Sequence, residues 1–158
     1  MAYRVIKGGL PYSCEQLFDL IIDVESYPRF VPWWEAVRVR ERENDHYHTE
    51  QVVRFPLMRH TFSTVTTFER PHRIDVVAQR GGLGRFSLTW RLNAGEDGMT
   101  AVDLMVEASG SISPIRKAAE ALSRDVVNML LAAFESEAAR IYLPLGDGAP
   151  PPPLEKTR

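Results

Sequence analysis

Hydrophobic and polar residues alternate with a period of two through the middle of the chain, from about residue 36 to residue 109. Asn-Asp, proline and glycine residues interrupt the alternation, as turns between strands do. Six runs with one apolar and one polar face therefore predict short antiparallel strands in a sheet that is wet on one side, and residues 3–7 predict a seventh strand. The apolar faces of the six runs consist of Val37 and Val39; Val53 and Phe55; Phe62, Thr64, Thr66 and Phe68; Ile74, Val76 and Ala78; Phe86, Leu88, Trp90 and Leu92; and Val102, Leu104, Val106 and Ala108.

A helical period appears before the first of these six runs. Ser13, with Gln16 three residues later, forms a capping box ahead of an apolar segment, which predicts a short helix of roughly 10 residues. The helix is expected to end before residues 23–26. Residues 27–34 contain two prolines, which exclude one regular helix and predict a helical turn followed by an aromatic loop.

A second helical pattern follows the last strand. Ser113 as the cap and Pro114 at the first helical position predict a helix start, and the pattern continues to about Tyr142. At 1.5 Å per residue such a helix is about 42 Å long, enough to lie across the sheet and cover its apolar face. Residues 144–158 include four consecutive prolines and predict a disordered or extended tail.

The order of these elements predicts an α+β chain with the helix-grip fold. A curved antiparallel sheet of about seven strands would wrap on one long C-terminal helix, with two short helices after the first strand. We expect one domain over residues 1–143 and a tail over residues 144–158. The long helix is rich in alanine, which leaves two interpretations open: small side chains that leave a cavity against the sheet, or good helix formers over a filled core.

Composition narrows the classes of protein that fit this fold. The chain has 158 residues and a net charge of −2, so it lacks the broad basic character of a general nucleic-acid binder, although a local basic patch is compatible with it. The single cysteine, Cys14, excludes an intramolecular disulfide and a cysteine-cluster zinc site. No apolar run approaches the roughly 18 residues that span a bilayer, and no signal peptide is visible. We therefore expect a cytoplasmic protein.

Three segments resemble one known family, the coenzyme Q-binding proteins of the START-like polyketide-cyclase superfamily, a group that includes a ribosome association toxin branch. The resemblance covers residues 2–143. Its most specific part is a Tyr-Pro-x-Phe-x-Pro-Trp stretch. The segments are Leu10-Pro11-Tyr12-Ser13 with residues 16–20 and 23–33; Phe86-Ser87-Leu88-Thr89-Trp90-Arg91-Leu92; and Phe134-Glu135-Ser136-Glu137-Ala138-Ala139.

The resemblance implies a START-like fold with a hydrophobic tunnel between the sheet and the long helix. It also implies that the chain binds a polyprenyl quinone such as ubiquinone and delivers it to respiration without acting on it as an enzyme. Such a ligand needs a dry apolar tube with one or two hydrogen-bond donors, and no catalytic cofactor or metal. Trp34 stands where many relatives carry a smaller residue, so its side chain is expected to narrow the tunnel mouth.

Candidate ligand contacts come from the apolar faces and from the aromatic loop. Thr64 and Thr66 could donate hydroxyl protons to a quinone, as could Tyr47 and Trp90, and the alternative is that the threonines bond to each other or to backbone. The aromatic loop could instead contact a membrane interface. The predicted ligand-binding residues are Tyr27, Phe30, Trp33, Trp34, Phe55, Phe62, Thr64, Thr66, Val76, Trp90, Leu122, Val126, Met129 and Leu130.

Two other functions fit parts of the sequence. Arg38, Arg40 and Arg42 share one strand face and could meet ribosomal RNA or anionic lipid, although a solvated face is the simpler interpretation. A polyketide aromatase or cyclase would need a general acid or base facing the tunnel. All four histidines are expected near strand ends or on outer faces, which disfavours that activity. DNA is not an expected partner.

Overall fold

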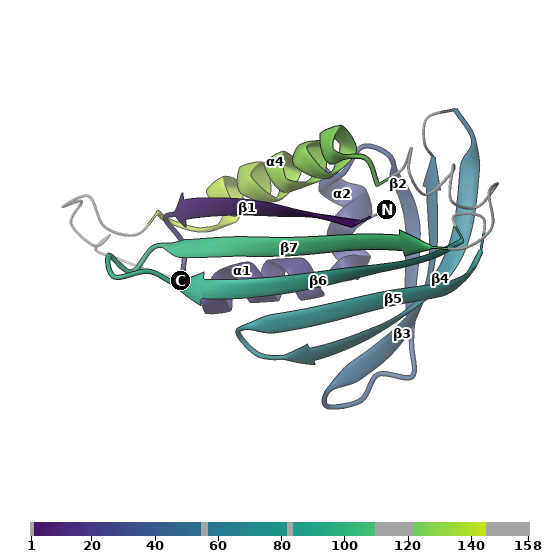
Figure 1. Ribbon diagram of the computed structural model, residues 1–158, viewed down its shortest axis with the longest axis horizontal. Coiled ribbons are helices and arrows are strands. Elements are labelled where there is room, and N and C mark those ends of the chain that lie inside the picture. Colours follow the sequence, from purple (N-terminus) through teal and green to yellow (C-terminus); the bar gives the residue numbers. More distant parts are fainter. Residues whose placement is uncertain (1, 55–56, 82–83, 110–121, 145–158) are drawn as a thin grey trace.

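A strongly curved antiparallel sheet forms most of the molecule in the computed structural model, which describes residues 2–54, 57–81, 84–109 and 122–144 (Figure 1). The helix-grip fold expected from the sequence is confirmed. Along the chain the elements are β1 (Ala2–Leu10), α1 (Cys14–Ile22), the 3-10 helix η1 (Val24–Ser26), α2 (Tyr27–Phe30), β2 (Trp34–Arg40), β3 (His46–Arg54), β4 (Arg59–Glu69), β5 (Arg73–Gly81), β6 (Arg85–Ala94), β7 (Thr100–Ser109) and α4 (Arg124–Ile141).

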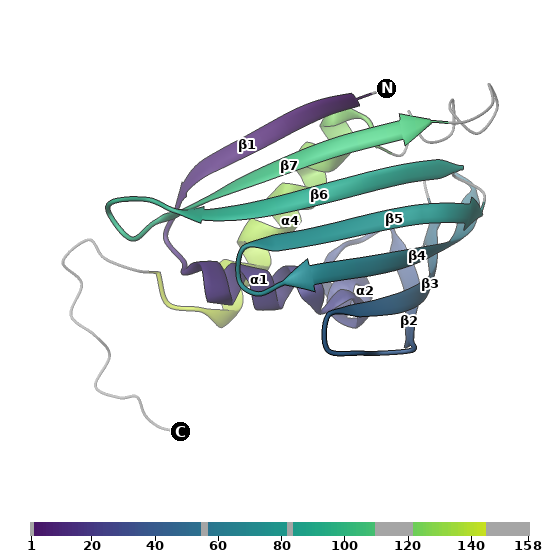
Figure 2. The same ribbon diagram turned by 60° about the horizontal axis from the view of Figure 1, so that its bottom comes forward.

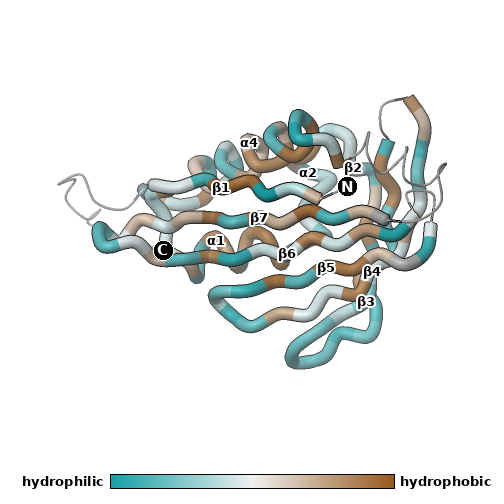
Figure 3. The backbone as a smooth tube through the Cα atoms, in the orientation of Figure 1, coloured by the Kyte–Doolittle hydropathy of each residue, from teal (hydrophilic) through white to brown (hydrophobic). Residues whose placement is uncertain are grey.

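The seven strands lie in the order β1-β7-β6-β5-β4-β3-β2, and every neighbouring pair is antiparallel. From β2 to β7 each strand pairs with the next one along the chain, and β1 pairs with the last. Hydrophobic and hydrophilic residues alternate along the strands (Figure 3). In β4 the side chains of Phe62, Thr64 and Thr66 are buried, while Thr61, Ser63 and their equivalents face outward. The period-two prediction is therefore confirmed, including its phase.

Helices α1, α2 and α4 all lie on the same side of the sheet (Figures 1 and 2). The expected capping box is present at the start of α1: Ser13 Oγ accepts from the Gln16 amide at 3.0 Å, and Gln16 Oε1 accepts from the Ser13 amide at 3.0 Å. Leu17, Phe18 and Ile21 are buried under this helix. A capped start and an apolar face thus fix where α1 begins and how it packs.

The C-terminal helix begins later than the sequence predicted. Residues 122 and 123 are not helical, and Ser123 has extended backbone with its hydroxyl accepting from the Val126 amide at 3.3 Å, so α4 starts at Arg124. The predicted start at Ser113 lies outside the described residues. The prediction of one uninterrupted helix is therefore wrong at Ser123, because the residue that caps a helix lies outside it.

Helix α4 turns Met129, one of the predicted ligand-binding residues, away from the sheet. Met129 is 52% exposed, whereas Leu130 and Phe134 are buried. Met129 and Phe134 are five residues apart, which places them about 140° apart around the helix. Phe134 packs edge-on against Trp90 of β6 at 5.7 Å between ring centroids, so the side of α4 that carries Phe134 covers the sheet.

Candidate functional site

A pocket lies between the inner face of the sheet and the helices. Its empty volume is about 920 Å³ when the space open to solvent at the entrance is counted. Within that space, the centres of water-sized molecules fit into about 80 Å³. The described residues therefore enclose a real but narrow cavity. A ligand in it must be slim or must displace side chains.

Most of the predicted ligand-binding residues line this pocket. Strands β4, β5 and β6 contribute the inner faces that the alternation indicated, and the aromatic segment and α4 close the other side. The predicted residues found in the lining are Tyr27, Trp33, Trp34, Phe62, Thr64, Thr66, Val76, Trp90, Leu122, Val126 and Leu130. The sequence thus located the walls of the cavity, and their contact with a ligand stays a prediction.

Two predicted residues lie outside the pocket, and a third is not described. The Phe30 ring packs edge-on against Tyr27 at 5.9 Å and against Phe134 at 5.6 Å, so it belongs to an aromatic cluster behind the wall. Met129 points away from the sheet, for the helical reason given above. Phe55 lies outside the described residues.

Other residues of the lining were missed. Gln51 has the clearest signal, because it follows the period-two phase of Val53 back along β3 to Tyr47. As a polar residue Gln51 was not among the residues predicted from the apolar faces, although it is buried in the structure. The missed lining residues are Ile21, Val24, Gln51, Val53, Ile74, Phe86, Leu88, Leu104 and Val127, whereas Tyr47, which also lines the pocket, was named above as a possible donor.

Two tyrosines of the pocket bind to the end of α1. Tyr27 Oη donates to the Ile21 carbonyl, and Tyr47 Oη donates to the Ile22 carbonyl at 2.8 Å. These carbonyls belong to the last turn of the helix, where the backbone has no partner within the helix. Burial raises the pKa of Tyr47 to about 12 and raises the pKa of Tyr27 well above its usual value of 10. Both phenols are therefore neutral near pH 7.

A second polar cluster crosses strands β2, β3 and β4. Trp34 Nε1 donates to Gln51 Oε1 at 2.9 Å, and Gln51 Nε2 donates to Thr49 Oγ1 at 2.8 Å. Thr49 Oγ1 and Thr64 Oγ1 are 2.5 Å apart, and Gln51 Nε2 is also 3.4 Å from Thr64 Oγ1. The two threonines and the glutamine are buried. The expectation that the threonines bond within the protein thus holds for Thr64, which is bound to Thr49 from the opposite strand.

Acidic and basic side chains do not contribute to the described lining of the pocket. Its ionisable residues are tyrosines, with no aspartate, glutamate, histidine, lysine, arginine or cysteine among them. His60 is the second residue of β4 and is buried on the same side as Phe62. It was expected near a strand end, which is correct, but burial distinguishes it from the other histidines. It is not part of the lining.

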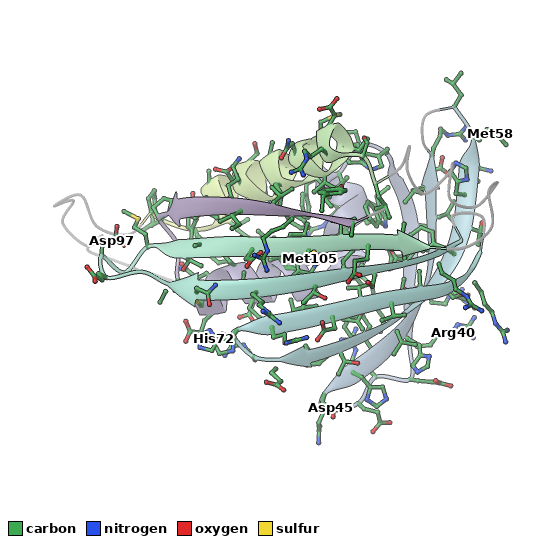
Figure 4. All side chains as sticks on the ribbon, in the orientation of Figure 1. Arg40, Asp45, Met58, His72, Asp97 and Met105 are labelled. Carbon is green, nitrogen blue, oxygen red and sulfur yellow. The ribbon has the colours of Figure 1, made fainter. Side chains whose placement is uncertain are left out.

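The connection from β3 to β4 carries two exposed apolar side chains. Leu57 is 86% exposed and Met58 is 61% exposed. Arg54 and Arg59 flank them and both bind Glu35, at 2.6 Å and 2.9 Å, which lowers the pKa of that carboxyl. Figure 4 shows Met58 at one end of the molecule and Asp97 at the other. This end therefore combines an apolar tip with two arginines and one carboxylate.

Of the three arginines predicted to share one strand face, Arg38 and Arg40 lie on β2, whereas Arg42 follows the end of that strand, and the charges are partly neutralised. Arg40 pairs with Glu50 at 3.3 Å, and Arg42 pairs with Glu25 at 3.5 Å while its guanidinium lies over the Tyr47 ring. All these charged groups are largely exposed, which suits a solvated face. In the described part of the chain, no three metal-ligating side chains converge, and no helix is long and apolar enough to cross a membrane.

Sequence comparison links the chain to one family. The family model described as polyketide cyclase / dehydrase and lipid transport matches residues 10–135. The chain is 31% identical to ribosome association toxin RatA of Rickettsia prowazekii over 52% of its own length and 59% of that protein. It is 27% identical to coenzyme Q-binding protein COQ10 homolog B, mitochondrial, of Xenopus laevis, over 84% of its own length and 56% of that protein. The matches thus span less than two thirds of these two relatives.

A third relative is matched almost completely. Ribosome association toxin RatA of Pseudomonas aeruginosa is 27% identical over 84% of this chain and 92% of that protein. The solution structure of an 18 kDa protein of Caulobacter crescentus is 31% identical, with a TM-score of 0.69 over 89% of this chain and 97% of that one. The Zhui aromatase/cyclase of Streptomyces sp. R1128 has a TM-score of 0.72 over 89% and 95%, at 17% identity. That last likeness shows the fold alone.

Proposed function

The chain belongs to the polyketide cyclase / dehydrase and lipid transport family, and from that membership we propose that it is a carrier of a polyprenyl quinone of the ubiquinone type. The observation that carries the proposal is the narrow apolar pocket under α4. The ligand would enter this pocket, be shielded from water and be released to the respiratory electron-transport system unchanged.

The chemistry of the lining supports a quinone ligand. Aromatic and aliphatic side chains make up most of the wall, as an isoprenoid tail requires, and a few buried hydroxyl and amide groups offer polar contacts to a ring carbonyl. A slim, flexible tail also suits a pocket of this width better than a rigid fused-ring molecule does. One relative is named for coenzyme Q binding, which is consistent with this ligand class.

The same lining supports carriage over catalysis. Aldol chemistry of the cyclase type needs a group that gives or takes a proton near neutral pH. The ionisable residues of the described lining are tyrosines. Burial raises the pKa of the Tyr27 and Tyr47 phenols, so both are neutral, and their protons are bonded to carbonyls of α1. We therefore propose a binding protein without a catalytic cofactor.

Delivery of an insoluble quinone implies contact with a bilayer. Leu57 and Met58 are exposed next to Arg54 and Arg59, a combination that suits the interface of an anionic membrane. We place the protein in the cytoplasm, in peripheral and reversible contact with the inner face of the cell membrane.

Thermal unfolding with and without decylubiquinone tests the proposal. A ligand at 100 times its Kd stabilises the native state by about 2.7 kcal/mol, so a clear rise in Tm is expected. Val76→Phe should abolish the rise by filling the pocket, whereas Val77→Phe on the outer face of the same strand should preserve it. A wild-type Tm that does not move with decylubiquinone, together with no lipid in organic extracts of the purified protein, would contradict the proposal.

Binding to the large ribosomal subunit is a second candidate function. Two relatives are named ribosome association toxins, and exposed arginines lie along β2. The net charge of −2 and the pairing of Arg40 and Arg42 with glutamates weigh against it. Co-sedimentation with large ribosomal subunits at physiological salt distinguishes ribosome binding from quinone carriage. Binding to the subunits that weakens as the salt concentration rises, and that weakens in an Arg38→Gln, Arg40→Gln double variant, would favour the ribosome.

A further inference from the structure

We propose that the pocket recognises one hydrogen-bond acceptor of its ligand, a carbonyl or ether oxygen, through the hydroxyl proton of Thr64. A chain of side-chain hydrogen bonds that starts at Trp34 directs this proton into the pocket. The inference rests on the proposed function, because it assigns ligand chemistry to the same pocket.

The first step of the chain fixes the orientation of Gln51. An indole nitrogen can only donate, so the Gln51 oxygen must face Trp34 Nε1, which lies 2.9 Å away. The amide nitrogen of Gln51 then faces the threonines and donates to Thr49 Oγ1 at 2.8 Å. Gln51 is buried, so solvent does not compete for these bonds.

The second step leaves one hydroxyl proton free. Thr49 and Thr64 are joined by a bond of 2.5 Å, which uses the proton of one of them. Thr49 already accepts from Gln51 and does not line the pocket, whereas Thr64 does. A free proton on Thr49 would be a buried donor with no partner, which is unfavourable. The stable arrangement therefore has Thr49 donating to Thr64, and Thr64 presenting its proton to the cavity.

The neighbouring Thr66 behaves differently. Thr66 lies opposite Tyr47 in the β3–β4 register, and its hydroxyl lowers the pKa of the Tyr47 phenol against the larger effect of burial, whereas the proton of that phenol goes to the Ile22 carbonyl at 2.8 Å. Thr66 must therefore donate to the Tyr47 oxygen, and its proton is already used. Thr64 and Thr66 are two residues apart on one strand face and line the same pocket, and they differ in where their hydroxyl protons go.

The position of Thr64 defines the ligand class. It lies opposite Thr49 on β3 and Ala78 on β5, and Phe62 is the next residue on its strand face. The ligand must therefore carry apolar groups next to the oxygen that accepts from Thr64. A quinone, ketone or ester oxygen meets this requirement, and a pure hydrocarbon leaves the Thr64 proton unpaired.

Two probes separate this inference from the proposed function. Decylubiquinone carries oxygen acceptors, and dodecylbenzene is an alkyl arene without oxygen. The Kd of decylubiquinone is measured by quenching of the pocket tryptophans, and binding of dodecylbenzene by the rise in Tm. We expect Thr64→Val to weaken decylubiquinone about tenfold and to leave the dodecylbenzene shift unchanged. Thr64→Ser, which keeps the hydroxyl, and Thr61→Val, on the exposed outer face of β4, should each stay within about twofold of wild type.

Other results would overturn the inference. A Thr64→Val variant that binds decylubiquinone as wild type does, or that loses both probes equally, would show that the hydroxyl is merely structural. If Thr64→Val does not fold, Trp34→Phe replaces it, since loss of the indole proton should weaken decylubiquinone about threefold at an unchanged dodecylbenzene shift. A wild-type protein that binds neither probe would instead contradict the proposed function, and the inference with it.

Discussion

Two tyrosines hold the end of the first helix, one from the sheet and one from α2. Tyr47 stands on β3, and its phenol reaches the Ile22 carbonyl at the end of α1, 25 residues earlier in the chain. Tyr27 makes the equivalent bond to Ile21 from α2. Because both rings also line the pocket, the same side chains that hold the helix form part of the cavity wall.

Tyr47→Phe tests this connection. Loss of the bond to Ile22 should lower the free energy of unfolding by about 1 kcal/mol near pH 7. The folded-state pKa of about 12 lies above the value of 10 in the unfolded chain, so the stability that depends on the neutral phenol is complete below pH 10 and is lost as the pH rises towards 12. Urea unfolding at pH 8 and pH 11 should show a smaller alkaline loss in Tyr47→Phe than in wild type. Equal losses would contradict the assignment.

Helices α1 and α4 each depend on one serine side chain at the point where the helix begins. The Ser13–Gln16 capping box begins α1, and the Ser123 hydroxyl begins α4. Both serines have extended backbone and accept from an amide that the helix itself leaves unpaired. The two caps set the residue at which each helix begins.

Ser13→Ala should lower the free energy of unfolding by about 1 kcal/mol through loss of the N-cap. Chemical denaturation followed by circular dichroism measures the change. Ser63→Ala is the matched control, because Ser63 is exposed on the outer face of β4 and its replacement should change stability by less than about 0.5 kcal/mol. A similar cost for both variants would show that the cap contributes nothing.

At the scale of the whole molecule, charge and apolar exposure are unevenly distributed. The net charge is −2, yet the end that carries Leu57 and Met58 has two arginines around one carboxylate. The opposite end, where the β6–β7 turn lies, carries Glu96 and Asp97 (Figure 4). Such a distribution would orient the molecule with its apolar tip towards an anionic surface.

A double variant, Leu57→Glu with Met58→Glu, tests the proposed membrane contact. Binding to phosphatidylglycerol vesicles, measured by co-sedimentation, should fall about tenfold or more because two exposed apolar side chains are replaced by acidic ones. Leu143→Glu is the control, since Leu143 is as exposed as Met58 but follows the far end of α4. The decylubiquinone shift in Tm should persist in all three proteins. Unchanged vesicle binding of the double variant would reject this surface.

Much of the fold could be predicted because its signals are local. Period-two alternation gave the strands and their buried faces, down to Phe62, Thr64 and Thr66 on β4. The serine and glutamine at positions 13 and 16 gave the start of α1. The prediction of one uninterrupted helix failed at Ser123, which caps α4 and therefore lies outside it. Cap choice there depends on packing against the sheet, which the local sequence does not contain.

The candidate site was predicted in its walls and missed in its polar contacts. Trp90 and Val76 follow from the alternation, whereas Gln51 breaks the expected apolar phase and was left out. A glutamine on an inner face is understandable only once Trp34 and Thr49 are seen beside it. Met129 shows the converse, an apolar residue that the rotation of its helix turns away from the pocket.

The sequence by itself determined the elements, the face of each strand that is buried and the apolar character of the interior, because these depend on residues close together in the chain. The tertiary structure alone decided which buried polar groups meet. Thr49 and Thr64 are 15 residues apart and face each other only through the β3–β4 register, and Trp34 reaches Gln51 from a third strand. Strand register and helix rotation are set by long-range packing, and a shift of one residue would turn every one of these donors to the other face.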